Sequence, residues 1–307
     1  MIQVNGQGRA LYPDPNAPRR FGRLDGVIIL IALAFVWYVY GRVSDVLVYK
    51  WDWSFLPGFF IRFDDEAGAW QTNILLKGLL TTIRLSVLAM VIASILGLIK
   101  GVMRTANRLL PRMIASSYVG LIRNIPPLVF IFVFYFFISS QIMPFFGVDR
   151  WARSLGDEQG WLFGLLLGEP KLLENMISGV ICLAMFEAAY ITEIVRAGIQ
   201  AIPKGQIEAG QSLGLSRFDV FRDIVLPQAL QKVTPPLANQ FIMLVKNSAI
   251  VALISVQELT FLGAEIATST RKPFETWIAI AGMYFLLCYG LSRLFARIER
   301  QSRRFER

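Results

Sequence analysis

The chain has 307 residues, and 55% of them are hydrophobic, against about 45–50% in a typical soluble protein. Histidine is absent, which removes the commonest general base and metal ligand. The two cysteines, Cys182 and Cys288, lie in separate apolar stretches, without the spacing of a metal site or a disulfide framework. No Walker A phosphate loop or H-E-x-x-H motif occurs, so no machinery for covalent chemistry can be recognised.

The hydrophobic residues gather in six long blocks that are apolar all round. A helix of about 20 residues spans about 30 Å, the thickness of the hydrocarbon core of a bilayer, whereas a soluble helix of that length would keep a polar stripe. The blocks cover residues 27–43, 74–99, 115–143, 174–196, 236–257 and 276–295. The sequence therefore predicts an all-α membrane protein with about six transmembrane helices.

The net charge of +9 is explained by where the basic residues lie. The two tails, the loop 100–112 and the stretch 196–234 hold 19 Lys and Arg residues, whereas the loops 44–77, 144–171 and 258–275 hold eight basic and twelve acidic ones. This alternation follows the positive-inside rule, which places both termini in the cytoplasm and needs an even number of spans. The charge thus favours a membrane topology over a nucleic-acid partner.

The segments around the first span differ from the rest of the chain. Residues 1–26 are too long and too rich in proline for the start of a signal peptide, so we expect a cytoplasmic tail. The loop after the first span is aromatic and acidic, and we expect it to lie along the outer membrane surface. In the loop 144–171, the apolar run Leu162–Leu167 is too short to span and predicts an interfacial or re-entrant helix.

The longest cytoplasmic segment, 197–234, predicts two short helices joined by a turn. The first is expected over Gln206–Leu213, and Gly214 suits a turn that needs a positive φ. Ser216 is a favourable N-cap for the second helix, which we expect to end near Pro227. The apolar residues available to form an exposed edge are Phe218, Phe221, Val225 and Leu226.

The same segment resembles the EAA loop of permease subunits of ABC importers. The residues that carry the resemblance are Glu208, Ala209, Gly210, Gly214, Ile224, Leu226 and Pro227. Their spacing matches the EAA–G–I-x-L-P pattern of that family, with Gly210 in place of the second alanine, which should loosen the first helix by up to ~1 kcal/mol. The resemblance implies that 203–228 is a cytoplasmic coupling loop and that Glu208 meets a basic group of an ATPase subunit.

The stretch 76–295 is similar to the polar amino-acid subfamily, the histidine- and glutamate-type permeases. The motifs are Gly78-Leu79-Leu80-Thr81-Thr82-Ile83, Arg123-Asn124-Ile125-Pro126, Ala188-Ala189-Tyr190-Ile191-Thr192-Glu193-Ile194, Ile202-Pro203-Lys204-Gly205-Gln206, Leu226-Pro227-Gln228-Ala229 and Lys246-Asn247-Ser248. The similarity implies a five-helix type I ABC importer core in a bacterial inner membrane, preceded by one extra helix. We therefore expect a cytoplasmic tail at 1–26, the extra helix and an external loop at 27–75, the transmembrane domain at 76–295, and a basic cytoplasmic tail at 296–307.

The resemblance also implies the partners and the source of energy. We expect two ATP-binding subunits, a second permease subunit that is identical or homologous, an external amino-acid-binding protein and membrane lipid. The partner ATPase subunits would use ATP and Mg²⁺, while this chain would bind no cofactor or metal and would have no ATPase site of its own. Closure of the ATPase subunits would move the coupling loop as a rigid body and rock the spans attached to it.

Polar residues at membrane depth mark the expected substrate pathway, because a charge there costs ~2.5–3.5 kcal/mol on insertion scales and usually faces a cavity or a partner. The candidates are Arg84, Glu187, Lys246, Asn247 and Ser248. An amino acid is a zwitterion, so Lys246 or Arg84 could receive its carboxylate and Glu187 its ammonium group. The same charges could instead pair with one another as structural ion pairs.

Three further charges near the cytoplasmic side have simpler interpretations. Glu193 and Arg196 are three residues apart on one helix and are expected to form a local pair. Arg123 lies near the start of its span and is expected to extend to the membrane interface.

Three other functions were weighed against the importer. An ATP-independent secondary transporter or channel would have the same spans, but the coupling-loop pattern and the lack of visible repeats argue against it. A membrane enzyme would need an acid–base or metal constellation, and the sequence contains none. An export permease would usually carry its own ATPase domain or lack this loop.

Overall fold

The computed structural model describes residues 21–46, 49–65, 68–154 and 161–302. The chain divides into two units, Met1–Trp51 and Asp52–Arg307, each described by itself. The first unit contains α1 (Arg23–Val46). The elements of the second unit are α2 (Leu56–Phe60), β1 (Ile61–Asp64), β2 (Ala69–Thr72), α3 (Ile74–Thr105), α4 (Leu109–Arg123), α5 (Pro127–Val133), η1 (Phe134–Ser139), α6 (Ser140–Phe145), α7 (Val148–Ser154), α8 (Trp161–Leu167), η2 (Pro170–Leu172), α9 (Leu173–Gln200), α10 (Lys204–Ser212), α11 (Arg217–Asp219), η3 (Val220–Val225), α12 (Leu226–Asn247), η4 (Ser248–Ile254), α13 (Leu259–Thr270) and α14 (Pro273–Ser302). Of these, η1 and η3 are π-helical, and η2 and η4 are 3₁₀-helical.

Six helical segments in the described part of the chain are long and apolar enough to cross a membrane. They are Arg23–Arg42, Ile74–Thr105, Pro127–Phe145, Pro170–Gln200, Arg217–Ile254 and Pro273–Gln301. None of the most apolar stretch of α1 is buried, and Leu30 and Trp37 are 67% and 77% exposed. A helix that is apolar all round suits the interior of a membrane. The predicted helical membrane fold and its number of spans are confirmed.

The predicted third span, 115–143, is wrong as a single helix. The structure ends α4 at Arg123, turns through Asn124–Pro126 and begins α5 at Pro127. Consecutive prolines cause the break, because the residue before a proline avoids the helical region and neither ring nitrogen carries a hydrogen to donate. The apolar run continues across this turn, so hydropathy alone could not detect it.

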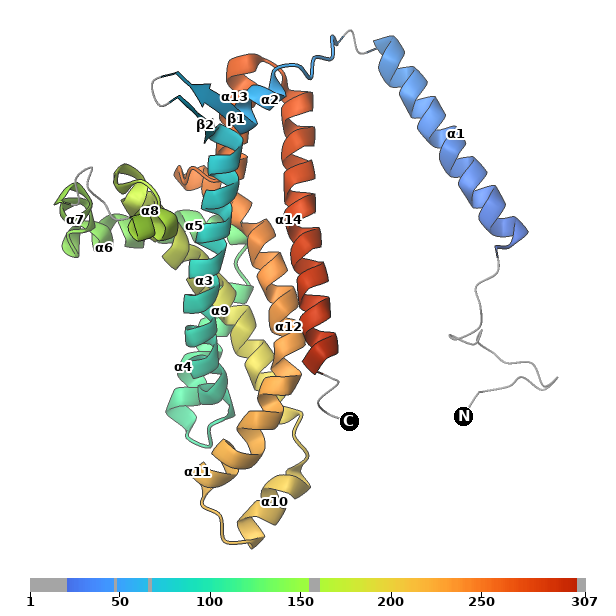
Figure 1. Ribbon diagram of the computed structural model, residues 1–307. Coiled ribbons are helices and arrows are strands. Elements are labelled where there is room, and N and C mark those ends of the chain that lie inside the picture. The colour runs from blue at the N-terminus through green and yellow to red at the C-terminus, as the bar shows by residue number, and fades with distance from the viewer. Residues whose placement is uncertain (1–20, 47–48, 66–67, 155–160, 303–307) are drawn as a thin grey trace. The chain divides into compact units, whose positions relative to one another are not determined.

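The helix predicted to end near Pro227 instead continues into the fifth span. Between α11 and α12 the backbone adopts the π-helical turn η3, and Pro227 lies in the first turn of α12. Proline cannot donate to the carbonyl four residues earlier, and a π turn changes the local hydrogen-bond spacing at that point. The short helix α11 is therefore joined to the long helix α12 without a loop (Figure 1).

The core of the second unit is centred on α9, and 67% of the most apolar stretch of this span is buried. It packs along α3, and the two helices lie side by side in Figure 1. A Cβ atom added to Gly97 would lie 2.5 Å from Ile191 Cγ2, and one added to Gly101 would lie 2.5 Å from Val195 Cγ1. Small residues recur every four positions along this face of α3, at Ala89, Ala93, Gly97 and Gly101. This spacing allows the two backbones to approach closely.

The end of the second unit opposite α10 carries a small antiparallel hairpin that the sequence analysis did not predict. β1 pairs with β2 so that Phe63 faces Trp70, and their rings meet edge to face at 5.4 Å. We call this the hairpin end and the other the α10 end (Figure 1). The predicted short helix at Leu162–Leu167 corresponds to α8; its interfacial position stays a prediction.

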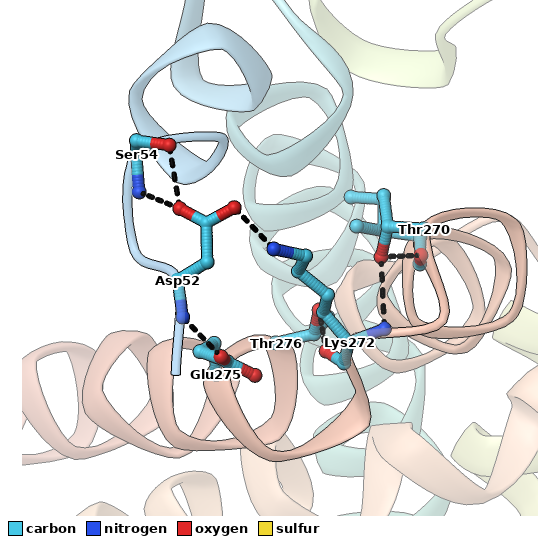
Figure 2. Close-up of polar contacts among 7 residues, drawn as sticks. Asp52, Ser54, Thr270, Lys272, Glu275 and Thr276 are labelled. Carbon is cyan, nitrogen blue, oxygen red and sulfur yellow. Dashed lines mark hydrogen bonds and ion pairs between the residues drawn. The ribbon is translucent and has the colours of Figure 1, made fainter. Parts of the chain in front are cut away.

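A polar cluster at the hairpin end fixes the segment before α2 to the corner between α13 and α14 (Figure 2). The Asp52 carboxylate forms an ion pair with Lys272, and the Asp52 N–H donates to Glu275 Oε1 at 2.8 Å. The Ser54 N–H donates back to Asp52 at 3.0 Å. The hydrogen bond from Lys272 lowers the pKa of Asp52 to about 2.

Glu258 joins three helices. Its carboxylate is fully buried and accepts hydrogen bonds from the Phe261 N–H at 2.8 Å, the Tyr284 hydroxyl at 2.7 Å and the Thr82 hydroxyl at 3.3 Å. It thereby caps the N-terminus of α13 and links it to α14 and α3. A buried carboxylate is tolerated because each of these donors offsets part of its desolvation.

Candidate functional site

The segment Lys204–Val225 folds into a hairpin of α10 against α11 and η3, which we call the α10–η3 hairpin. The predicted turn is confirmed: Gly214 has φ of +81°. The Leu215 N–H donates to Gly210 O at 3.2 Å, and the Gly214 N–H donates to Gln211 O at 3.0 Å. These are the paired bonds of a Schellman cap, which ends a helix at a residue in the left-handed region.

Ser216 begins the second arm as predicted. Its hydroxyl oxygen accepts from the Asp219 N–H at 3.2 Å and lies 2.6 Å from the Asp219 carboxylate. The hydroxyl therefore satisfies a backbone donor that the start of a helix would otherwise leave free. With the Schellman cap immediately before it, this bond sets the angle between the two arms.

A small apolar core holds the two arms together. Ile202, Val220 and Val225 are buried in it, and Ile207 and Ile224 pack against them. Gly210 is buried, and a Cβ there would lie 2.6 Å from Ile224 Cδ1. The departure from the EAA pattern at Gly210 therefore allows α10 to sit close to η3, a reason that the sequence alone did not supply.

The outer surface of the hairpin is free in this chain. Glu208 and Ala209 are exposed, and so are Leu213, at 83%, and Phe218, at 67%. The predicted apolar edge is only partly correct, because Val225 is buried and Phe221 and Leu226 are half-buried. Leu213 was missed: it closes the predicted first helix, and only the cap geometry turns its side chain outward.

One side-chain hydrogen bond connects the hairpin to the helix bundle, and a second joins the two spans on either side of the hairpin. The Gln228 amide donates to Gln206 Oε1 at 2.6 Å, which joins the start of α12 to α10. The Lys232 ammonium group donates to Ala201 O at 3.0 Å, at the end of α9. Both arms are thus attached to spans: α10 follows α9 across residues 201–203, and η3 runs directly into α12.

Among the expected pathway residues, Glu187 and Asn247 meet directly. Glu187, on α9, is fully buried and accepts hydrogen bonds from the side-chain amides of Asn247, at 2.8 Å, and Gln240. Gln240 was missed, although its spacing of seven residues from Asn247 places both on one face of a helix. Ser248 is buried beside them and donates to Val245 O at 2.8 Å.

Lys246 points away from this cluster. Its side chain is exposed and lines a cavity of about 550 Å³ with residues of α14, including Tyr284, Cys288 and Ser292. Within the described residues, the structure records no ion pair between Lys246 and Glu187. The pairing considered from the sequence is therefore wrong in this conformation, because neighbouring residues of a helix point about 100° apart.

Arg84 lies in a second cavity, of about 520 Å³, near the hairpin end. Its walls come from α3, the end of α8, the start of α9, α13 and the residues just before α13. Lys77 and Arg84 bring positive charge to the walls, and Glu169 and Glu265 bring negative charge. Arg84 Nε is buried and makes no hydrogen bond among the residues that the structure describes. The other three charges could not be assigned to this site from the sequence, because they come from segments far apart along the chain.

The family match decides what this arrangement belongs to. A family profile described as the binding-protein-dependent transport system inner membrane component matches residues 93–304. The chain belongs to this family. Its neighbours in structure are type I ABC importer permeases, so it is the membrane-spanning translocation subunit of an ABC importer.

Named relatives agree with this assignment. The permease is 34% identical over 197 residues to the arginine ABC transporter permease protein ArtQ of Escherichia coli strain K12, covering 62% of this chain and 79% of that protein. It is 32% identical over 220 residues to the probable glutamine ABC transporter permease protein GlnM of Bacillus subtilis strain 168, covering 72% and 89%. A crystal structure of an amino acid ABC transporter with histidines superposes with a TM-score of 0.58 at 31% identity, covering 74% and 94%.

Membership of this family has consequences for assembly. The permease is a multi-pass protein of the inner membrane, its ATPase activity lies in separate subunits, and its partners include ATP-binding subunits and a substrate-binding protein. The exposed surface of the α10–η3 hairpin is then available to a separate subunit of the importer.

Proposed function

We propose that this permease moves polar amino acids and that the Arg84 cavity lies on their pathway. The relatives named above are described as arginine, glutamine and amino-acid transporters, which supports the substrate class. The observation that carries the proposal is the cavity itself. It brings two cationic and two anionic side chains together, and its volume lies within the range of about 300–1,000 Å³ typical of small-molecule sites.

Each end of a zwitterion finds a matching group in this cavity. The Arg84 guanidinium, whose Nε makes no hydrogen bond within the described residues, suits a carboxylate, since arginine presents donors in a planar fork that matches two carboxylate oxygens. The ammonium group of the substrate would then face Glu169 or Glu265. Because the lining charges balance, neither a strong acid nor a strong base is favoured over a neutral zwitterion. Glu187, Lys246, Asn247 and Ser248 remain candidates further along the pathway.

We further propose that the α10–η3 hairpin receives the movement of the ATP-binding subunits. Exposed Glu208 would pair with a basic group, and exposed Leu213 and Phe218 would enter an apolar groove of that partner. The residues expected to shape this surface are Glu208, Ala209, Gly210, Gly214, Ile224, Leu226 and Pro227. Since η3 joins α12 without a loop, displacement of the hairpin would move the fifth span with it.

The proposed complex has two ATP-binding subunits, which hold ATP and Mg²⁺, and a second permease that is the same chain or a homologue. Both termini and the α10–η3 hairpin would face the cytoplasm, and the β1–β2 hairpin would face outward. Cysteines introduced at 50–65 should then react with an impermeant thiol reagent from outside, while those at 210–225 should not. Labelling of 210–225 in sealed cells would contradict this orientation.

The substrate proposal is tested by transport. The permease would be reconstituted with its ATP-binding and substrate-binding partners, and uptake of labelled arginine, glutamine, glutamate, histidine and leucine would be measured with ATP. We expect ATP-dependent uptake of at least one polar amino acid and little of leucine. Uptake without ATP would indicate a secondary transporter.

Arg84→Gln keeps a polar side chain that can donate hydrogen bonds and removes its charge. We expect it to reduce uptake at least ten-fold, since a charged hydrogen-bond partner is worth about 1.5–3 kcal/mol. Arg108→Gln, at the exposed start of α4, is the matched control and should leave uptake unchanged. Normal uptake by Arg84→Gln in an assembled complex would remove the cavity from the pathway.

Coupling is tested by Gly214→Val, which places a β-branched residue at φ of +81°. Basal ATP hydrolysis by the partner subunits should persist, and its stimulation by transport should fall. Gly205→Val is the control, because a Cβ at Gly205 meets no atom within 4 Å. Normal stimulation in the Gly214 variant would separate the hairpin from coupling.

A further inference from the structure

A separate basic cavity lies between α3, α4 and α9 near the α10 end. Its volume is about 330 Å³, and its lining includes Arg104, Ser116, Arg123, Asn124 and Glu193. It shares no residue with the Arg84 cavity or with the α10–η3 hairpin. Neither substrate binding nor coupling as proposed above uses it.

The charges around this cavity are unbalanced. Glu193 accepts from Arg196 at 2.9 Å, which confirms the predicted local pair, and it also forms an ion pair with Arg104 across the α3–α9 interface. Arg123 lines the same cavity as Arg104, and Arg196 pairs with the same carboxylate as Arg104, so like charges lie near one another here. The guanidinium groups of Arg104 and Arg196 thus share one carboxylate, and with Arg123 added the net charge of the four groups is positive.

Arg123 has N–H donors that are available to a ligand. The structure describes no carboxylate paired with it; its one recorded contact is with the ring of Tyr190, whose centroid lies 5.5 Å from the guanidinium carbon. Arg104 gives part of its donor fork to Glu193 and retains further N–H groups, since a guanidinium carries five. The Ser116 hydroxyl also lines the cavity and adds a neutral donor.

The helix that carries Arg123 exposes large apolar side chains. On α4, Leu110, Met113 and Leu121 are 70%, 55% and 62% exposed. A charged pocket at the end of an apolar helix face matches an amphiphile with an anionic head and hydrocarbon tails. Basic pockets between transmembrane helices bind lipid head groups by this combination.

We propose that this cavity binds the phosphate head group of an anionic phospholipid, with Arg123 and Arg104 as the cationic ligands. The acyl chains would run along the exposed face of α4. An occupied cavity would neutralise the excess positive charge where α3, α4 and α9 meet, and it would brace the end of α9 that leads into α10. A free phosphate ion could satisfy the same cations, so the test must distinguish the two sources.

The test measures lipid binding to the delipidated importer complex by native mass spectrometry. Phosphatidylglycerol and phosphatidylcholine would be titrated in parallel, and we expect the anionic lipid to bind more tightly. Arg123→Gln should weaken phosphatidylglycerol binding about five-fold, the factor expected for one basic residue near a lipid surface. Arg108→Gln, about 22 Å away along α4, removes the same charge outside the cavity and should change binding less than two-fold.

A second variant keeps the charge and fills the space. Ser116→Leu should also weaken phosphatidylglycerol binding, and it decides the matter if Arg123→Gln fails to assemble. Equal binding of the two lipids, or equal losses in the Arg123 and Arg108 variants, would overturn the proposal. Full displacement of the lipid by inorganic phosphate, itself dependent on Arg123, would assign the cavity to a free anion and would also overturn it.

Discussion

The side-chain amide of Asn247 donates a hydrogen bond of 2.8 Å to the buried carboxylate of Glu187, joining the end of α12 to the middle of α9. Gln240 donates to the other carboxylate oxygen. The neighbour of Asn247, Lys246, faces a different cavity, lined by α14. The buried acid of this permease is therefore stabilised by two neutral amides from one helix, and the nearby cation is left free for another role.

This relationship predicts the result of a double-mutant cycle. Lys246→Met and Glu187→Gln should change the thermal stability of the detergent-solubilised permease additively, within about 0.5 kcal/mol, because the two side chains share no contact. Asn247→Leu combined with Glu187→Gln should show a coupling energy of roughly 0.5–3 kcal/mol. Equal coupling energies in the two cycles would mean that the cation and the acid interact in solution.

The contact between α3 and α9 depends on Gly97. Gly97→Val would push a branched side chain into Ile191, whose Cγ2 would lie 2.5 Å from the new Cβ, and overpacking of this kind costs about 1–3 kcal/mol. We expect a lower thermal denaturation midpoint in detergent. Gly290→Val on α14 is the control, since a Cβ there meets nothing within 4 Å. If both variants melt together, the close approach of the two helices does not hold the bundle together.

Gly210 offers a test in which two effects oppose each other. Gly210→Ala should gain up to ~1 kcal/mol of helix propensity and lose a similar amount by displacing the terminal methyl group of Ile224, so transport should stay near normal. The larger side chain of Gly210→Leu cannot be accommodated by moving one methyl group. It should separate α10 from η3 and lower transport-stimulated ATP hydrolysis several-fold. Gly205→Leu, on the open side of α10, should neither separate the two arms nor lower transport-stimulated ATP hydrolysis. Full stimulation with Gly210→Leu would show that the arms need not touch.

The contact between Asp52 and Lys272 predicts a pH dependence. The pKa of Asp52 is lowered from 3.8 to about 2, so its stabilising effect is present above pH 3.8 and is lost as the pH falls through about 2. Hydrogen-exchange protection of the Ser54 amide, corrected for intrinsic rates, should therefore be constant between pH 5 and 8. Lys272→Met should reduce this protection, and Lys171→Met, in exposed η2, should not. A fall in protection between pH 5 and 8 would point to a different partner for Asp52.

The sequence by itself determined the features that depend on local physics. Apolar blocks as long as a bilayer is thick specified the membrane spans, because lipid offers no partner for an open backbone. The turn at Gly214 and the cap at Ser216 could be predicted, since each depends on one residue and its neighbours within a few positions. The spacing from Glu208 to Pro227 was sufficient to indicate the family.

Only the tertiary structure decided which side chains share a site. Lys77, Arg84, Glu169 and Glu265 are brought to one cavity from distant segments, and no periodicity along the chain encodes that meeting. The break before Pro127 and the continuous helix through Pro227 show the same limit, because one proline ended a helix and the other was absorbed by a π turn. The local rule for a residue gives its conformational preference. The packing of α9 against its neighbours then selects one of the backbone conformations that this preference allows.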